Sequence, residues 1–81
     1  MTFEDAILLI KQELERAEKL HPVWPTDKIH AAAIVSEESG ELVQACNNIL
    51  NYIGCTEEDY YKVKKEAVHT AVTAIRFLIN M

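Results

Sequence analysis

The chain has few of the residues that break helices or cross-link small folds: among 81 residues there are two glycines, two prolines and two cysteines. Because Cys46 and Cys55 are too few for a disulfide framework, and the N-terminus shows neither a basic leader nor an apolar secretion segment, we expect reduced thiols and a cytoplasmic location. No run approaches the roughly 18 apolar residues that cross a bilayer. We therefore expect a soluble protein without a membrane partner.

Basic runs are also missing. The chain has 8 Lys and Arg against 13 Asp and Glu, which gives a net charge of −5. Without a basic stripe to displace the counterions of a phosphate backbone, binding to a nucleic-acid polymer is not expected. An anionic small molecule can still bind if a cation bridges it to the protein.

The residues that are present predict an all-α fold. Hydrophobic residues make up 49% of the chain and charged residues 26%, as in compact folded domains. We expect a single domain over 1–81, with helices at about 3–20, 28–52 and 57–80. Thr2 with Asp5, and Thr56 with Asp59, have the spacing of helix-capping pairs. The charged residues of the first helix are expected to face solvent, Glu13 and Arg16 among them.

The size of the chain and its third helix predict self-association. One core in so short a chain gives marginal stability. The apolar residues of the third helix, from Val63 to Ile79, spread over more than half of its circumference, so this helix must be covered on two sides. We expect a three-helix subunit that completes a helical bundle as a dimer or tetramer.

The second helix carries glutamates at positions where its apolar face should have apolar side chains. At about 100° per residue, Glu38 lies in the apolar stripe of Ile34 and Leu42, with Glu41 at the edge of that stripe and Glu37 just beyond. A buried carboxylate has to be neutralised, paired or bound to a metal. This pattern violation indicates a site on the second helix.

Two further features of the second helix bear on that site. Gly40 costs the helix about 1 kcal/mol relative to alanine, and a close helix contact beside the carboxylates would explain it. The break before the helix contains Trp24 between two prolines. Trp24 has two interpretations, a plug over the end of the core or an aromatic wall for a ligand base.

A narrow polar stripe on the third helix complements the carboxylates. It consists of Lys62, Glu66, His69, Thr73 and Arg76, at spacings of three and four residues. A helix that faces only water normally has a wider polar face, so we expect this stripe to face something specific. Asn48 and Gln44 project from the second helix on the same flank as Glu37 and Glu41.

Together the two helices carry the patterns E-E-x-x-E, at 37–41, and E-x-x-H, at 66–69. Two antiparallel helices can bring Glu38, Glu41, Glu66 and His69 together on one hard cation. Oxygen-rich ligation with an incomplete protein shell suits Mg²⁺, with Mn²⁺ as the alternative.

The pattern resembles that of the MazG-like all-α nucleoside triphosphate pyrophosphohydrolases, whose signature is E-E-x-x-E, a spacer, and E-x-x-D on the following helix. The resemblance covers about Ile29 to Leu78. It implies a helical dimer or tetramer that uses Mg²⁺ to split a (deoxy)nucleoside triphosphate into the monophosphate and pyrophosphate.

Matched by position, the resemblance places Glu38, Glu41 and Glu66 as metal ligands and Glu37 at the leading glutamate. His69 stands where the family has aspartate, which removes one charge and one hard oxygen and weakens Mg²⁺ binding. The bound cation would clamp the triphosphate and acidify a water. Glu37 would act as general base.

Lys62 or Arg76 would contact the outer phosphate oxygens of the nucleotide. This assignment depends on the positions of the two residues in the polar stripe. Trp24 and Asn48 complete the expected substrate-binding residues.

Two alternatives belong to other classes. Glu66-x-x-His69 is also the helical pair of di-iron and di-manganese carboxylate bundles. Alternatively, the histidine in place of aspartate signals a decayed site in a noncatalytic helical interaction protein.

Overall fold

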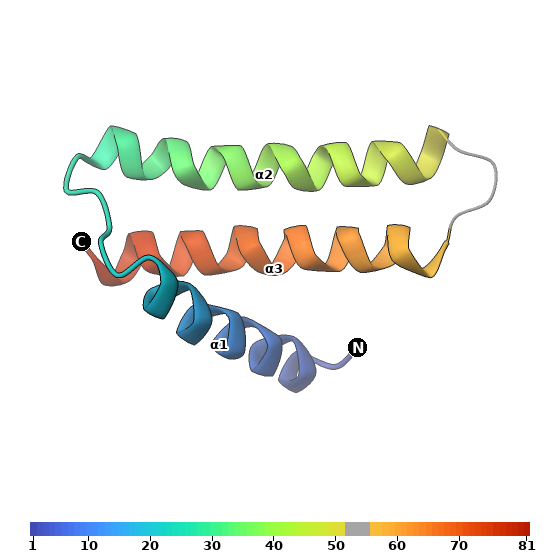
Figure 1. Cartoon of the computed structure of the whole chain (residues 1–81), viewed down its shortest axis with the longest axis horizontal. Coiled ribbons are helices and arrows are strands. Elements are labelled where there is room, and N and C mark those ends of the chain that lie inside the picture. The colour runs from blue at the N-terminus through green and yellow to red at the C-terminus, as the bar shows by residue number, and fades with distance from the viewer. Residues whose placement is uncertain (52–55) are drawn as a thin grey trace.

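The computed structural model describes residues 1–51 and 56–81 of the chain. They form three helices, α1 (Phe3–Leu20), α2 (Lys28–Asn51) and α3 (Glu57–Ile79), and no strand is found in these two ranges (Figure 1). The predicted all-α, three-helix fold is confirmed. The expected helix end at Tyr52 and the Cys55 thiol lie outside the described residues.

Local hydrogen bonds fix where the helices begin. In the predicted capping pairs, the Thr2 and Thr56 hydroxyls accept from the backbone N–H of Asp5 and Asp59 at 3.1 and 3.2 Å, and the two aspartates accept in return. Both capping boxes are confirmed. Asp27 accepts from two backbone N–H groups in the first turn of α2, at 2.8 and 3.2 Å.

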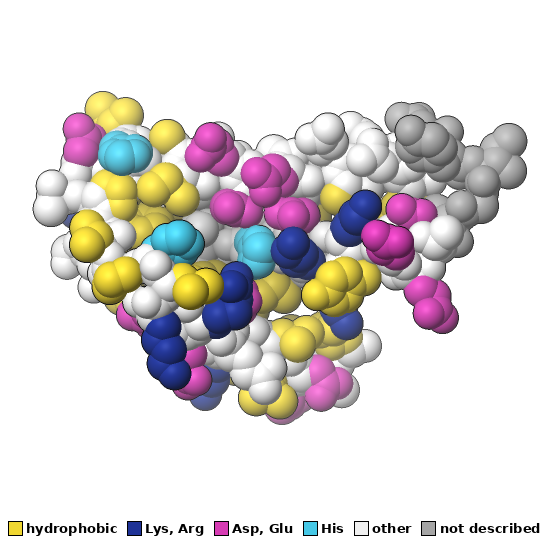
Figure 2. Space-filling model, in the orientation of Figure 1, with side chains coloured by type: hydrophobic (Ala, Val, Ile, Leu, Met, Phe, Trp, Pro, Cys, Tyr) yellow, Lys and Arg dark blue, Asp and Glu magenta, His cyan; other side chains and the backbone are white. Residues whose placement is uncertain are grey.

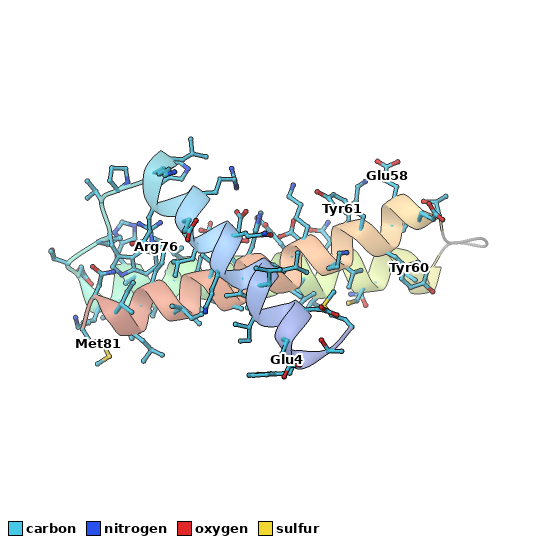
Figure 3. All side chains as sticks on the ribbon, turned by 90° about the horizontal axis from the view of Figure 1, so that it is seen from below. Glu4, Glu58, Tyr60, Tyr61, Arg76 and Met81 are labelled. Atoms are coloured by element: carbon cyan, nitrogen blue, oxygen red, sulfur yellow. The ribbon has the colours of Figure 1, made fainter. Side chains whose placement is uncertain are left out.

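Helix α3 lies at the centre of the arrangement. It runs antiparallel to α2, and α1 crosses it obliquely on another side (Figures 1 and 3). The expectation that α3 is covered on two sides is confirmed. None of the helices, over the residues described, combines the length and apolar character needed to traverse a bilayer.

The core between these helices is small. Among the described apolar residues only Ala31 and Val72 are buried, with 1% and 2% of their surface exposed. Many large apolar side chains are exposed instead, on all three helices. Most of the described apolar side chains are therefore only partly removed from water, which limits the hydrophobic stabilisation of the subunit.

Arg76 connects the chain segment between α1 and α2 to the C-terminal end of α3. It is 7% exposed, donates to the His21 carbonyl oxygen at 2.5 Å, and lies over the Trp24 ring at 5.0 Å from the ring centre. A guanidinium at this distance from an aromatic face is a cation–π contact. Arg76 therefore holds Trp24 beside the end of the helix pair.

Gly40 does not have the surroundings expected from the sequence. A Cβ atom built at this position meets no heavy atom within 4 Å among the described residues. No helix among the described residues of the subunit therefore makes the close contact expected at Gly40.

Candidate metal centre

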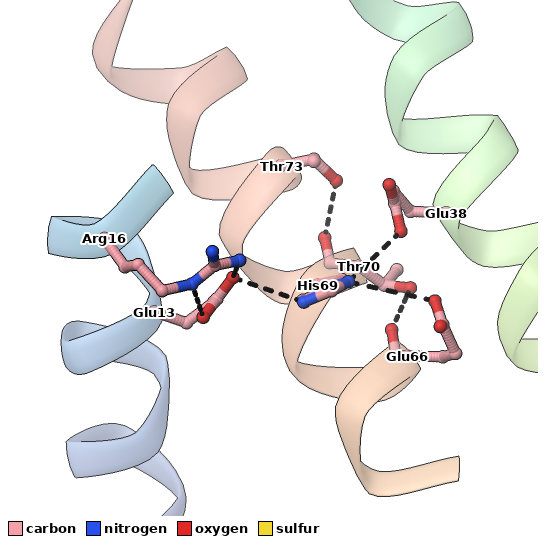
Figure 4. Close-up of polar contacts among 7 residues, drawn as sticks. All are labelled: Glu13, Arg16, Glu38, Glu66, His69, Thr70 and Thr73. Carbon is pink, nitrogen blue, oxygen red and sulfur yellow. Dashed lines mark hydrogen bonds and ion pairs between the residues drawn. The ribbon is translucent and has the colours of Figure 1, made fainter. Parts of the chain in front are cut away.

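Three of the predicted ligands converge where the middle of α2 faces α3. Glu38, Glu66 and His69 each offer one ligand atom, and these atoms all lie within 4.8 Å of one another. His69 Nδ1 is 3.8 Å from Glu38 Oε2 and 3.9 Å from Glu66 Oε2 (Figure 4). Two carboxylates and one imidazole therefore point toward a common centre.

The same two oxygens lack hydrogen-bond partners. Glu38 Oε2 and Glu66 Oε2 are buried and accept no hydrogen bond from any described group, although their side chains are 25% and 18% exposed. Unpartnered buried acceptors are unusual. An ion bound at about 2.1 Å needs ligand atoms roughly 3.0 to 3.4 Å apart, so small side-chain rotations would make these three residues fit a divalent cation.

Burial and neighbouring carboxyl groups raise the pKa values of two of these glutamates. Burial, and next the charge of Glu41, raises the pKa of Glu38 above its ordinary value of 4.5. Burial, and next the interaction with the Glu41 carboxyl group, raises the pKa of Glu66. Glu41 is exposed, but it interacts with both. The charged forms of Glu38 and Glu66 are therefore less favoured than those of free carboxyl groups, and a bound cation would favour them.

The sequence analysis missed Glu13, which reaches this group from α1. Its Oε1 lies 3.2 Å from His69 Nε2, and its side chain is only 18% exposed. Arg16 donates to both of its oxygens, at 2.8 and 2.6 Å (Figure 4). The expectation that Glu13 faces solvent was wrong.

The signal for Glu13 was nevertheless in the sequence. Glu13 follows Ile10 by three residues and precedes Ala17 by four, so it lies in the apolar stripe of α1. This is the same pattern violation that identified Glu38.

The other residues predicted for the site lie outside the cluster of Glu38, Glu66 and His69. Glu37 is exposed and does not belong to the three-residue cluster. Glu41, Asn48 and Lys62 line a hollow of about 420 Å³ between α2 and α3, together with Glu66 and Lys65. Figure 2 shows acidic side chains gathered over the middle of α2, with histidine and basic side chains beside them.

Trp24 and Arg76 line a second hollow, of about 450 Å³, which also reaches Glu38 and His69. His21 and His30 belong to its wall. Because Glu66 borders the first hollow and His69 the second, the cluster of Glu38, Glu66 and His69 lies between an aromatic hollow and a lysine-bearing one.

Comparison of the chain with protein-family models, with curated proteins and with solved structures gave no match.

Proposed function

We propose that this protein is a nucleoside triphosphate pyrophosphohydrolase of MazG-like architecture, which uses Mg²⁺ or Mn²⁺ to cleave a (d)NTP to the (d)NMP and pyrophosphate. The observation that carries the proposal is the convergence of Glu38, Glu66 and His69, with two buried oxygens that no described group satisfies. These residues occupy the motif positions on which the family resemblance rests.

The roles of the acidic residues follow from where they lie. Glu38, Glu66 and His69 would hold the cation, and Glu41 would complete its surroundings from the edge of the group. When bound, the cation supplies charge neutralisation at the phosphates and a water of lowered pKa. We assign the general base to Glu37, whose position in the motif favours that role.

The two hollows suit the two ends of a nucleotide. Lys62 and Lys65, with Asn48, offer donors for phosphate oxygens on one side of the cluster. Trp24 offers an aromatic surface for a base on the other side. Because the Arg76 guanidinium is buried and already engaged by His21 and Trp24, we now propose that it positions Trp24 and does not contact phosphate.

We further propose that the protein is cytoplasmic and works as a dimer or tetramer. The exposed apolar side chains on all three helices support self-association.

The test is a panel of ribo- and deoxyribonucleoside triphosphates, each incubated with and without Mg²⁺ or Mn²⁺ and assayed for monophosphate and pyrophosphate. We expect metal-dependent release of pyrophosphate, lost in Glu38→Gln and Glu66→Gln. Glu15→Gln is the control, because Glu15 is exposed and lies about 200° around α1 from Glu13.

Other results would identify the alternative functions. His69 among the converging ligands also favours a di-iron or di-manganese carboxylate site, which tightly bound iron or manganese in the purified protein would support. If no substrate is cleaved and no divalent cation binds, the proposed hydrolase is refuted in favour of a helical interaction protein.

A further inference from the structure

Glu13 and His69 form a contact that the proposed reaction does not require. The two residues come from different helices, and α1 would need no carboxylate here if its role were only to cover α3. Yet Glu13 is largely buried and lies 3.2 Å from His69 Nε2.

The two nitrogens of His69 have different surroundings. Nε2 is within hydrogen-bond distance of Glu13 Oε1, whereas Nδ1 is 3.8 and 3.9 Å from Glu38 Oε2 and Glu66 Oε2. Distances of that length are too great for hydrogen bonds. A single proton on the ring is thus best placed on Nε2, and the lone pair of Nδ1 then points toward the two unpartnered oxygens.

Arg16 keeps Glu13 in the state that this arrangement needs. It donates to both carboxylate oxygens, which fixes the plane of the carboxylate. The same carboxylate presents Oε1 to His69 Nε2 at 3.2 Å. Glu13, held by Arg16, is therefore placed as an acceptor facing Nε2.

We propose that Glu13, oriented by Arg16, is a positioning residue that fixes His69 as its Nε2–H tautomer and so makes Nδ1 a metal ligand. Carboxylate–histidine–metal chains of this kind orient the ring and raise its basicity as a ligand. The inference rests on the metal site of the proposed function, but it requires neither hydrolysis nor a nucleotide.

The nitrogen ligand determines the class of cation. Mg²⁺ takes oxygen ligands and keeps its waters, whereas Mn²⁺ accepts carboxylate oxygen and imidazole nitrogen together. The site therefore favours Mn²⁺ over Mg²⁺ more strongly than a site of carboxylates only. Replacing His69 by aspartate should remove that preference.

The tautomer is measured directly by long-range ¹H–¹⁵N correlation spectra of the metal-free protein labelled with ¹⁵N-histidine. The chain has three histidines, so the His69 signals are assigned from their loss in His69→Gln. At a pH at which the ring is neutral, we expect a protonated Nε2 and an unprotonated Nδ1. Glu13→Leu should give a mixture of tautomers, and Glu15→Leu should leave the wild-type pattern.

Metal ligation is measured with Mn²⁺ as the probe. Electron spin echo measurements should show coupling to a ¹⁴N nucleus in the wild type and none in His69→Asp. Glu13→Leu should weaken Mn²⁺ binding by about 10- to 100-fold, with Arg16→Leu in the same direction and Glu15→Leu without effect. The ratio of Mg²⁺ to Mn²⁺ dissociation constants should fall in His69→Asp.

A protonated Nδ1 in the wild type, or bound Mn²⁺ without nitrogen coupling, would overturn the inference. So would failure of Mn²⁺ to bind, a result that also removes the metal from the proposed function. If Mn²⁺ binds with nitrogen coupling and Glu13→Leu weakens it, but no nucleotide is cleaved, the inference stands and the hydrolase proposal fails.

Discussion

At the scale of single residues, Glu38 and Glu66 lower the stability of the metal-free protein at neutral pH. Both have folded-state pKa values raised by burial and by neighbouring carboxylates. A carboxyl group with a raised pKa binds protons more tightly in the folded state, so its stabilising effect is present below the ordinary pKa and disappears as pH rises through the folded value. Glu13 acts in the opposite sense, because its lowered pKa stabilises the fold above 4.5.

We predict a pH-dependent stability difference between the wild type and Glu38→Gln. The amide cannot ionise, so the melting temperature of the variant should exceed that of the metal-free wild type by an amount that grows as pH rises from 4.5 to 7. Removing one unfavourable charge typically contributes about 0.5–2 kcal/mol, and each kcal/mol corresponds to roughly 4–8 °C in a domain of this size. Thermal unfolding followed by circular dichroism at several pH values measures the difference.

Addition of Mn²⁺ should reverse the order. The cation binds only the folded wild-type site and stabilises it by mass action, whereas Glu38→Gln has lost a ligand. Glu15→Gln serves as the control and should follow the wild type in both conditions. A lower melting temperature for metal-free Glu38→Gln at pH 7 would contradict the repulsion inferred from the cluster.

At the scale of helices, the sequence predicted the helix caps and the apolar face of each helix. It did not predict where α1 crosses α3. A cap such as Thr56 with Asp59 involves residues that are three apart in the sequence. The apolar face of a helix is likewise given by the spacing of residues within that helix alone. Which residue of α3 meets Glu13 depends on where α1 crosses α3, and the position of a stripe does not fix that crossing. For this reason the sequence indicated Glu38, Glu66 and His69 but not the contact between Glu13 and His69.

Gly40 gives a prediction about α2. The position is helical and exposed, and a methyl group there meets nothing within 4 Å among the described residues. Gly40→Ala should therefore raise the free energy of unfolding by about 1 kcal/mol, through helix propensity. Chemical denaturation measures it, with Ser39→Ala as a neighbouring control expected to change stability by only a few tenths. A loss of stability in Gly40→Ala would mean that another subunit packs against this glycine.

Arg76 gives a prediction about how the segment between α1 and α2 is held. Arg76→Met keeps the apolar stem but removes the hydrogen bond to the His21 carbonyl and the cation–π contact with Trp24. We expect a loss of about 1–3 kcal/mol in the free energy of unfolding. Because Trp24 is the one tryptophan of the chain, its fluorescence should shift to longer wavelength in the folded variant.

Two variants sharpen the Arg76 experiment. Arg76→Lys retains the charge but not the planar guanidinium, so its effect should be intermediate. Lys62→Met removes a cation that is 62% exposed and 3.9 Å from Glu58, and should change stability by less than about 0.5 kcal/mol. Equal effects of Arg76→Met and Lys62→Met would show that the buried contacts of Arg76 contribute nothing to the fold.

At the scale of the whole molecule, the subunit leaves large apolar side chains on all three helices exposed. Only two apolar residues are buried among those described, while side chains such as Leu78 and Ile79 are 65% and 59% exposed. An apolar hollow of about 350 Å³ crosses from α2 to α3, lined by Ala32, Val35, Ala74, Phe77 and Leu78. A second copy that covers this surface would bury what the isolated subunit leaves in water.

We predict that the protein is a dimer or tetramer at micromolar concentration and that Leu78→Lys weakens the association. A lysine in the hollow would place an unpaired charge in an apolar interface, which costs several kcal/mol unless the interface opens. Analytical ultracentrifugation over a concentration series measures the shift toward the monomer, and circular dichroism shows whether that monomer unfolds. Leu8→Lys, at a 56% exposed position on α1, adds the same charge outside the hollow and should leave the association unchanged. If Leu8→Lys dissociates the assembly and Leu78→Lys does not, the contact surface lies on α1, whereas a wild-type chain that is monomeric and folded at all concentrations would remove the need for a partner subunit.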